Sequence, residues 1–149
     1  MSHHVILYVF QFFNGIRYFL TVESNRFPGS LKAPGGTNKE LQFQQETIEE
    51  TSLRELREEG DDKRIEIGRF VFVAEKLVSD DHKQVALLLF DVKNLQGLDE
   101  VRYIEERDER GYLKEKLKTR WVAETEFEAH MHPGQVSFYR KLRRMTEMR

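Results

Sequence analysis

The dipeptide Asn14-Gly15 is the feature that most constrains how this chain folds. It lies between two runs rich in β-branched and aromatic residues, Val5–Phe13 and Ile16–Glu23. Asn-Gly is the strongest two-residue hairpin sequence, because both of its positions accept positive φ angles. The first 23 residues are therefore predicted to form a β-hairpin.

The rest of the chain alternates between strand-like and helix-like segments. Residues 47–59 are predicted to be helical, since Thr47 and Glu50 form a capping box and Gly60 is placed to end the helix. The charged run Leu98–Lys118 is assigned no more than one strand of its own. The remaining predictions are strands at Ile65–Val78, Val85–Val92 and Lys118–Ala123, and a last helix at Gln135–Met145. Strands interleaved with two helices indicate an α/β or α+β domain.

Length and composition restrict the class of protein. A chain of 149 residues suits one domain, 1–149, and the net charge of −2 gives no general electrostatic attraction for nucleic acid or an anionic membrane. The absence of cysteine excludes disulfides, zinc-thiolate sites and thiol nucleophiles. The apolar run near the N-terminus is far shorter than the about 20 residues of a membrane span. We therefore expect a cytoplasmic protein with no membrane segment.

A cluster of acids carries the chemistry. On a helix, Glu55, Glu58 and Glu59 share an arc of roughly 100°, whereas Leu53 and Leu56 face the other way. Three carboxylates so close repel one another unless a cation lies among them, and a hard divalent cation such as Mg²⁺ takes oxygen ligands. The alternative is a solvated glutamate-rich face without a ligand.

These residues resemble the signature of a known family. Gly-Gly, Glu46 after a spacer, seven further residues and then Arg-Glu-Leu-x-Glu-Glu at 54–59 are similar to the Nudix box, Gly-x5-Glu-x7-Arg-Glu-U-x-Glu-Glu-x-Gly-U, where U is a bulky aliphatic residue. The resemblance covers residues 35–61 and implies a Nudix-like α/β/α sandwich with a mixed, curved sheet. Two departures stand out: Thr37–Gln45 resembles a four-residue insertion, and Gly60-Asp61-Asp62 replaces x-Gly-U.

The resemblance also implies a role for each box position. Mg²⁺ or Mn²⁺ would be bound by Glu58 and Glu59, with the Gly35 carbonyl assisting in a Gly35-Gly36 turn. Glu55 would serve as a further ligand or as the base that activates water. Arg54 would orient the acids, and Glu46 would pair with Arg54. The expected catalytic residues are thus Glu55, Arg54 and Glu58, with a further ligand or base from downstream at Glu100, Glu105 or Glu106.

The implied activity is hydrolysis of a nucleoside diphosphate linked to another group, most simply a nucleoside triphosphate or a nucleotide sugar, by water attack on phosphorus. RNA with a cap or a 5′-triphosphate, the substrate of an RNA 5′-pyrophosphohydrolase, is a further candidate. A non-catalytic nucleotide-sensing module on the same fold is the alternative from a different class, and the residues that mark substrate subclasses in the family are missing. A homodimer that pairs through the edge of the N-terminal hairpin is also expected.

Other features have a structural and a functional interpretation. The pair His130 and His132 lacks a third metal ligand at convincing spacing and is expected to be a turn or surface pair. Trp121 and Tyr139 are candidates for nucleobase stacking or for the core. The C-terminal cations Arg140, Lys141, Arg143 and Arg144 either contact a phosphate or RNA or form the polar face of the last helix.

Overall fold

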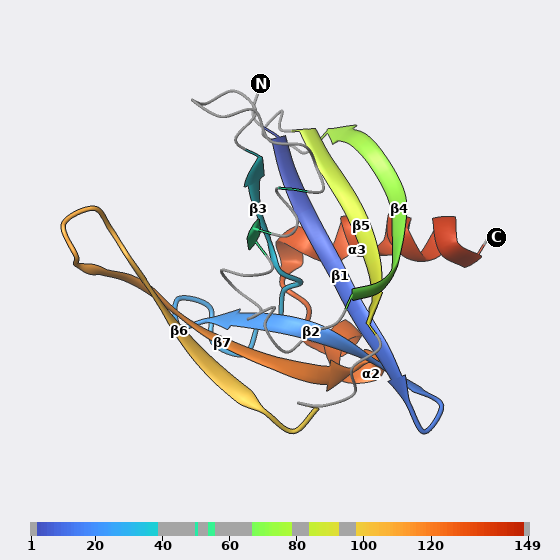
Figure 1. Cartoon of the computed structure of the whole chain (residues 1–149), viewed down its shortest axis with the longest axis horizontal. Coiled ribbons are helices and arrows are strands. Elements are labelled where there is room, and N and C mark those ends of the chain that lie inside the picture. Colours follow the sequence, from blue (N-terminus) through green and yellow to red (C-terminus); the bar gives the residue numbers. More distant parts are fainter. Residues whose placement is uncertain are drawn as a thin grey trace.

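The computed structural model describes residues 3–38, 50, 54–55, 67–78, 84–92 and 98–147. Its strands form one seven-stranded sheet in the order β4-β5-β1-β2-β7-β6, with β3 beside β1 (Figure 1). The strands are β1 (His3–Phe13), β2 (Ile16–Ser24), β3 (Gly35–Asn38), β4 (Ile67–Val78), β5 (Gln84–Val92), β6 (Val101–Arg107) and β7 (Leu113–Ala123). The two helices near the C-terminus are α2 (Glu124–Ala129) and α3 (Pro133–Glu147).

The sheet is mixed, as expected. β1 pairs with β5 in parallel, and the other pairings are antiparallel. The N-terminal hairpin is confirmed, and its turn has Asn14 at φ 51° and Gly15 at φ 77°. Both angles lie in the left-handed region that a two-residue hairpin turn with the native twist requires. The hairpin strands lie inside the sheet, because β1 is flanked by β5 and β2 and the edges are β4 and β6. The hairpin edge on which a dimer was expected is thus occupied within the chain.

β1 and β2 separate beyond their common turn, and residues 31–38 fill the gap between them. We call this segment the wedge. On one side, the Leu7 amide donates to the Pro34 carbonyl at 2.8 Å. On the other side, the Val22 amide donates to the Lys32 carbonyl at 2.7 Å. The wedge continues as β3 alongside β1, so both hairpin strands keep their backbone hydrogen bonds where they part.

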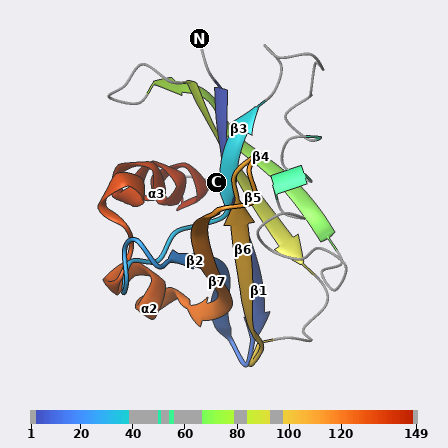
Figure 2. The same cartoon turned by 90° about the vertical axis from the view of Figure 1, so that its left-hand side faces the viewer.

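An aromatic core joins one face of the sheet to α2 and α3 (Figure 2). Tyr8 and Phe19 come from the sheet, and Phe127 and Tyr139 come from the helices. Their ring centroids lie 5.1–6.5 Å apart in tilted or edge-on arrangements. Buried aromatic pairs of this kind add about 0.5–1.5 kcal/mol each beyond their area burial. This cluster fixes the helices on the sheet.

Several boundaries differ from the sequence expectations. Residues 98–118 contain all of β6 and the start of β7, because charged residues on exposed positions hide the period-2 pattern of these strands. The short helix α2 was not expected. Gly35-Gly36 lie in strand β3 and not in a turn. Residues 50, 54 and 55 are helical as predicted, and the rest of the predicted 47–59 helix lies outside the described residues. No described helix is long and apolar enough to cross a bilayer.

Candidate active site

The side chain of Glu55 lies directly against the backbone of Gly36. A Cβ atom placed on Gly36 would fall well within 3.0 Å of the Glu55 carboxyl carbon and of both carboxylate oxygens, a separation that real Cβ atoms essentially never show. Only glycine therefore permits this approach. The Glu55 side chain is 8% exposed, so the carboxylate is held in a buried position. Two residues singled out by the sequence, 19 positions apart, are thus brought into contact.

Arg54 supplies a positive charge beside this carboxylate. Its Nη1 atom lies 2.8 Å from Oε1 of Glu55, and the Arg54 side chain is itself only 23% exposed. A buried carboxylate needs such a partner, because transfer of an uncompensated charge out of water is unfavourable by several kcal/mol. A charge-assisted hydrogen bond of this kind fixes the direction of the carboxylate, and the orienting role of Arg54 in a site stays a prediction.

Gly35 is closely packed for a different reason. A Cβ atom here would meet the carbonyl oxygen of Val5 within 3.0 Å, so β3 can pair with β1 at this point only if the residue has no side chain. The wedge is also anchored to α3. The Gln135 side chain accepts a hydrogen bond from the Ala33 amide at 2.8 Å and donates to the Ala33 carbonyl at 3.2 Å. Gln135 therefore holds the segment that presents Gly36 to Glu55.

The strand register places this contact on the sheet face away from α2 and α3. Gly36 lies opposite Val5, which alternates along β1 with the core residues Ile6 and Tyr8. Figure 2 shows the short helical segment at 54–55 on one side of the sheet and the two C-terminal helices on the other. Phe19 and Val122 are opposite each other and face the helices. The next pair, Leu20 and Trp121, faces the other way, so Trp121 lies on the same face as Glu55. Tyr139 belongs to the core on the helix side.

Gln11 is a polar residue on the Glu55 face that belongs to no motif in the sequence. It is fully buried, and neither its Nε2 nor its Oε1 has a hydrogen-bond partner in the part of the chain that the structure describes. A buried amide without partners is uncommon in folded proteins. Its only sequence signal is a single glutamine within the apolar run that forms β1.

Three predicted site residues, Glu46, Glu58 and Glu59, lie outside the described residues. Among the described residues there is no group of three or more His, Cys, Asp or Glu side chains that could hold a metal ion. Glu55 is the described member of the predicted acid cluster, and its oxygen atoms are of the type that Mg²⁺ binds. The predicted metal ligands at 58 and 59 remain predictions.

The downstream acids lie on or beside β6, where Glu100 and Glu105 are exposed and Glu106 is half-buried. Glu100 pairs with Arg102 at 3.2 Å, and Glu105 pairs with Arg107 at 2.6 Å. Ile104 is opposite Leu117, which lies on the same sheet face as Trp121 and Glu55. Side chains alternate along β6, so Glu105 lies on the other face, the one that carries α2 and α3. Glu106, on that second row, shares the face of Glu55. His132 accepts a hydrogen bond from the Gly134 amide at 3.0 Å, as expected of a turn residue.

Comparison with known proteins identifies the fold. A Nudix hydrolase from M. smegmatis, RenU, has a TM-score of 0.55 at 17% identity, over 98% of this chain and 86% of that one. The Ap4A hydrolase of C. elegans has a TM-score of 0.58 at 14% identity, over 99% and 97% of the two chains. The Nudix domain of Shewanella oneidensis NrtR, complexed with ADP ribose, has a TM-score of 0.53 at 15% identity, over 97% of this chain and 87% of that one.

The chain has a Nudix-type fold. No protein-family model matches the sequence, and no curated protein matches it significantly. The likeness is therefore one of fold, and it confirms the expected mixed sheet with its N-terminal hairpin. Within this fold, the structure brings together Gly35, Gly36, Arg54 and Glu55 of the Nudix-like segment.

Proposed function

We propose that the protein is a Nudix-type pyrophosphohydrolase that cleaves a nucleoside diphosphate linked to another group. The observation that carries this proposal is the buried Glu55 carboxylate, seated on Gly36 and paired with Arg54 on the sheet face opposite the C-terminal helices. In a glutamate-rich helix that only faces solvent, no carboxylate would need to pack against the backbone of a glycine. The burial of Glu55 thus favours a built site over the solvated alternative.

Each described residue has a part in this proposal. Glu55 acts as a metal ligand or as the base that takes a proton from the attacking water. Arg54 holds the Glu55 carboxylate in one orientation, Gly36 leaves room for that carboxylate, and Gly35 leaves room for the pairing of β3 with β1. Glu106, which shares the Glu55 face, is the downstream acid best placed to assist.

The predicted cofactor is Mg²⁺ or Mn²⁺. Its ligands would be Glu55, Glu58 and Glu59, with the Gly35 carbonyl assisting and Glu46 pairing with Arg54. Carboxylate oxygens suit these hard cations, which keep open positions for water and phosphate oxygens. When bound, such a cation neutralises phosphate charge and lowers the pKa of a coordinated water. Preorganised charge would supply most of the rate acceleration.

The substrate class follows from the same proposal. The C. elegans protein is an Ap4A hydrolase, and the NrtR domain was crystallised with ADP ribose. Both compounds contain a nucleoside diphosphate joined to a further group. A nucleoside triphosphate or nucleotide sugar fits this description in the present protein, and Trp121 on the Glu55 face is a candidate for stacking on the base. The competing function is nucleotide sensing without turnover.

The test is release of phosphate or pyrophosphate from a panel of nucleotides with and without Mg²⁺. The panel spans triphosphates, nucleotide sugars, ADP-ribose, dinucleoside polyphosphates and 5′-triphosphate RNA. Glu55→Gln and Glu59→Gln are compared with Glu109→Gln, which removes one charge from an exposed position in the β6–β7 turn. We expect metal-dependent turnover that both box variants lower by at least 100-fold and the control leaves unchanged. Nucleotide binding without turnover in the folded parent would favour the sensor.

A further inference from the structure

A second candidate site lies on α3, away from Glu55. A groove of about 740 Å³ runs along this helix and reaches the end of α2. Its volume falls within the roughly 300–1,000 Å³ typical of small-molecule sites. Half-buried Met131 and Val136 give it an apolar part. The helix α3, which lines the groove, lies on the side of the sheet opposite to the short helical segment at 54–55 (Figure 2), so a ligand here would not overlap the proposed active site.

The groove is strongly basic. Its described lining contains four cations, Arg140, Lys141, Arg143 and Arg144, and one carboxylate, Glu128. The local balance is therefore 4 − 1 = +3, in a chain whose net charge is −2. A basic concave surface of this kind attracts anions before contact and holds them after it.

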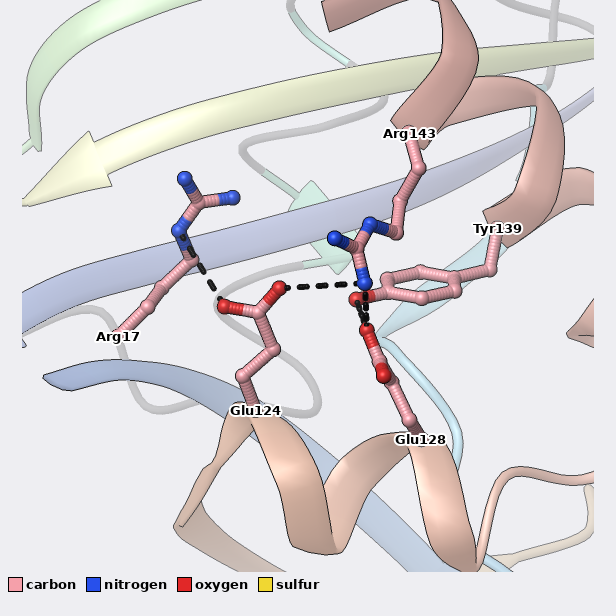
Figure 3. Close-up of polar contacts among 5 residues, drawn as sticks. All are labelled: Arg17, Glu124, Glu128, Tyr139 and Arg143. Carbon is pink, nitrogen blue, oxygen red and sulfur yellow. Dashed lines mark hydrogen bonds and ion pairs between the residues drawn. The ribbon is translucent and has the colours of Figure 1, made fainter. Parts of the chain in front are cut away.

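One of the four cations is already engaged within the protein. Figure 3 shows the Arg143 guanidinium between Glu124 and Glu128, with the Tyr139 hydroxyl donating to the same Glu128 carboxylate. This network ties α3 to α2 and neutralises Arg143. It acts as a fixed wall of the groove and leaves the other cations to bind a ligand.

The remaining three cations have no such partner among the residues that the structure describes. No hydrogen bond or ion pair joins the side chain of Arg140, Lys141 or Arg144 to any carboxylate that the structure describes. Arg140 and Arg144 are four residues apart on one helix, so their Cβ atoms lie about 5–6 Å from each other. Two guanidinium groups at this spacing suit a phosphate or diphosphate, to which each can donate two parallel hydrogen bonds.

We propose that the α3 groove binds a small phosphorylated molecule of nucleotide size. Its phosphates lie on Arg140, Lys141 and Arg144, and its apolar part lies on Met131 and Val136. The C-terminal cations that the sequence left with two interpretations are thus assigned to a ligand site. This inference does not depend on the proposed hydrolase activity, because it uses no residue of the Glu55 site.

The experiment is calorimetric titration with ADP and adenosine at low ionic strength in the presence of EDTA, which removes metal-dependent binding near Glu55. We expect ADP to bind at least 10-fold tighter than adenosine. The double variant R140E/R144E should weaken ADP binding at least 10-fold. The matched control R110E/K114E makes the same change in charge at two exposed positions, one in the β6–β7 turn and one at the start of β7, and should change ADP binding less than 2-fold. Glu55→Gln should leave ADP binding unchanged even where it abolishes hydrolysis.

Several outcomes overturn the assignment. These are absence of ADP binding to the parent, equal weakening by the two double variants, or loss of binding in Glu55→Gln alone. An oligonucleotide that binds 10-fold tighter than ADP, with the same dependence on R140E/R144E, would make the groove a nucleic-acid contact instead. If R140E/R144E fails to fold, R140Q/R144Q replaces it. Methyl NMR shifts of Met131 and Val136 on addition of ADP report the location independently.

Discussion

The substitution Gly36→Ala tests the central contact of the candidate site. The added Cβ atom would lie inside 3.0 Å of three atoms of the Glu55 carboxylate, whereas ordinary contact begins at 3.4 Å. The carboxylate must therefore retreat by more than 3.4 − 3.0 = 0.4 Å from the position that it holds against Gly36. Catalytic groups need to be held within about 0.5 Å of their working positions. We expect hydrolysis to fall by about 10–100-fold.

The stability of Gly36→Ala should change less than its activity. The atoms that must move belong to the end of a flexible side chain, so urea unfolding should show a loss of about 1 kcal/mol, at the lower end of the range for overpacking. Gly35→Ala is the matched comparison. Its Cβ atom meets the backbone oxygen of Val5 in a strand that is paired on both sides. This variant should therefore be destabilised more than Gly36→Ala.

A double-mutant cycle with Glu55→Asp separates the contact from catalysis. Aspartate is shorter by one methylene, so it relieves the clash with an alanine at position 36. The free energies of unfolding of Gly36→Ala and Glu55→Asp should couple by about 1 kcal/mol, with the double variant more stable than the sum of the single changes predicts. Additive free energies, or a Gly36→Ala enzyme with parental activity, would refute the seating of Glu55 on Gly36.

Three further predictions concern the scaffold. Gly15→Ala should lose about 1 kcal/mol in urea unfolding, because φ is 77° and no atom lies near the new Cβ; an unchanged stability would contradict the turn geometry. Gln135→Leu should lose about 1–3 kcal/mol by removing both hydrogen bonds to Ala33, and a loss below about 0.5 kcal/mol would count against the clamp. Burial raises the pKa of both Tyr8 and Tyr139 above the ordinary value of 10.0, so the folded state keeps two protons that the unfolded chain releases. Stability should therefore fall by about 2.7 kcal/mol per pH unit above pH 10, which urea unfolding at pH 10–11.5 checks against Tyr8→Phe.

The sequence was informative about the fold wherever local chemistry determines the structure. Asn14-Gly15 forms the expected hairpin because few sequences tolerate two positive φ angles in succession. The sequence was uninformative for β6 and β7, where charged residues occupy exposed positions and mask the alternation of buried ones. It also gave no indication that the hairpin would lie inside the sheet, because the parallel pairing of β1 with β5 joins segments about 80 residues apart.

The candidate site was predictable in part for a related reason. The Nudix-like segment pointed to Gly36, Arg54 and Glu55, which the structure brings together, and their roles in a site stay predictions. The two glycines differ from expectation, because they lie in a strand and not in a turn. Gly36 is needed for contact with a carboxylate and Gly35 for contact with a neighbouring strand, and neither forms a turn. Gln11 was not predicted, because a single polar residue in an apolar strand has no pattern that distinguishes it from an exposed position.

The wedge contacts α3 on one face of the sheet and Glu55 on the other, so the position of Glu55 is expected to depend on how α3 is packed. Gln135 at the start of α3 fixes Ala33, and three residues later Gly36 presents its backbone to Glu55. The segment between them is only three residues long, so we expect a shift of α3 to be felt at Gly36. On this argument, the aromatic cluster that packs α3 on the sheet would also affect the position of the carboxylate. Substitutions in that cluster should act on catalysis through the wedge, although none of its residues shares a face with Glu55.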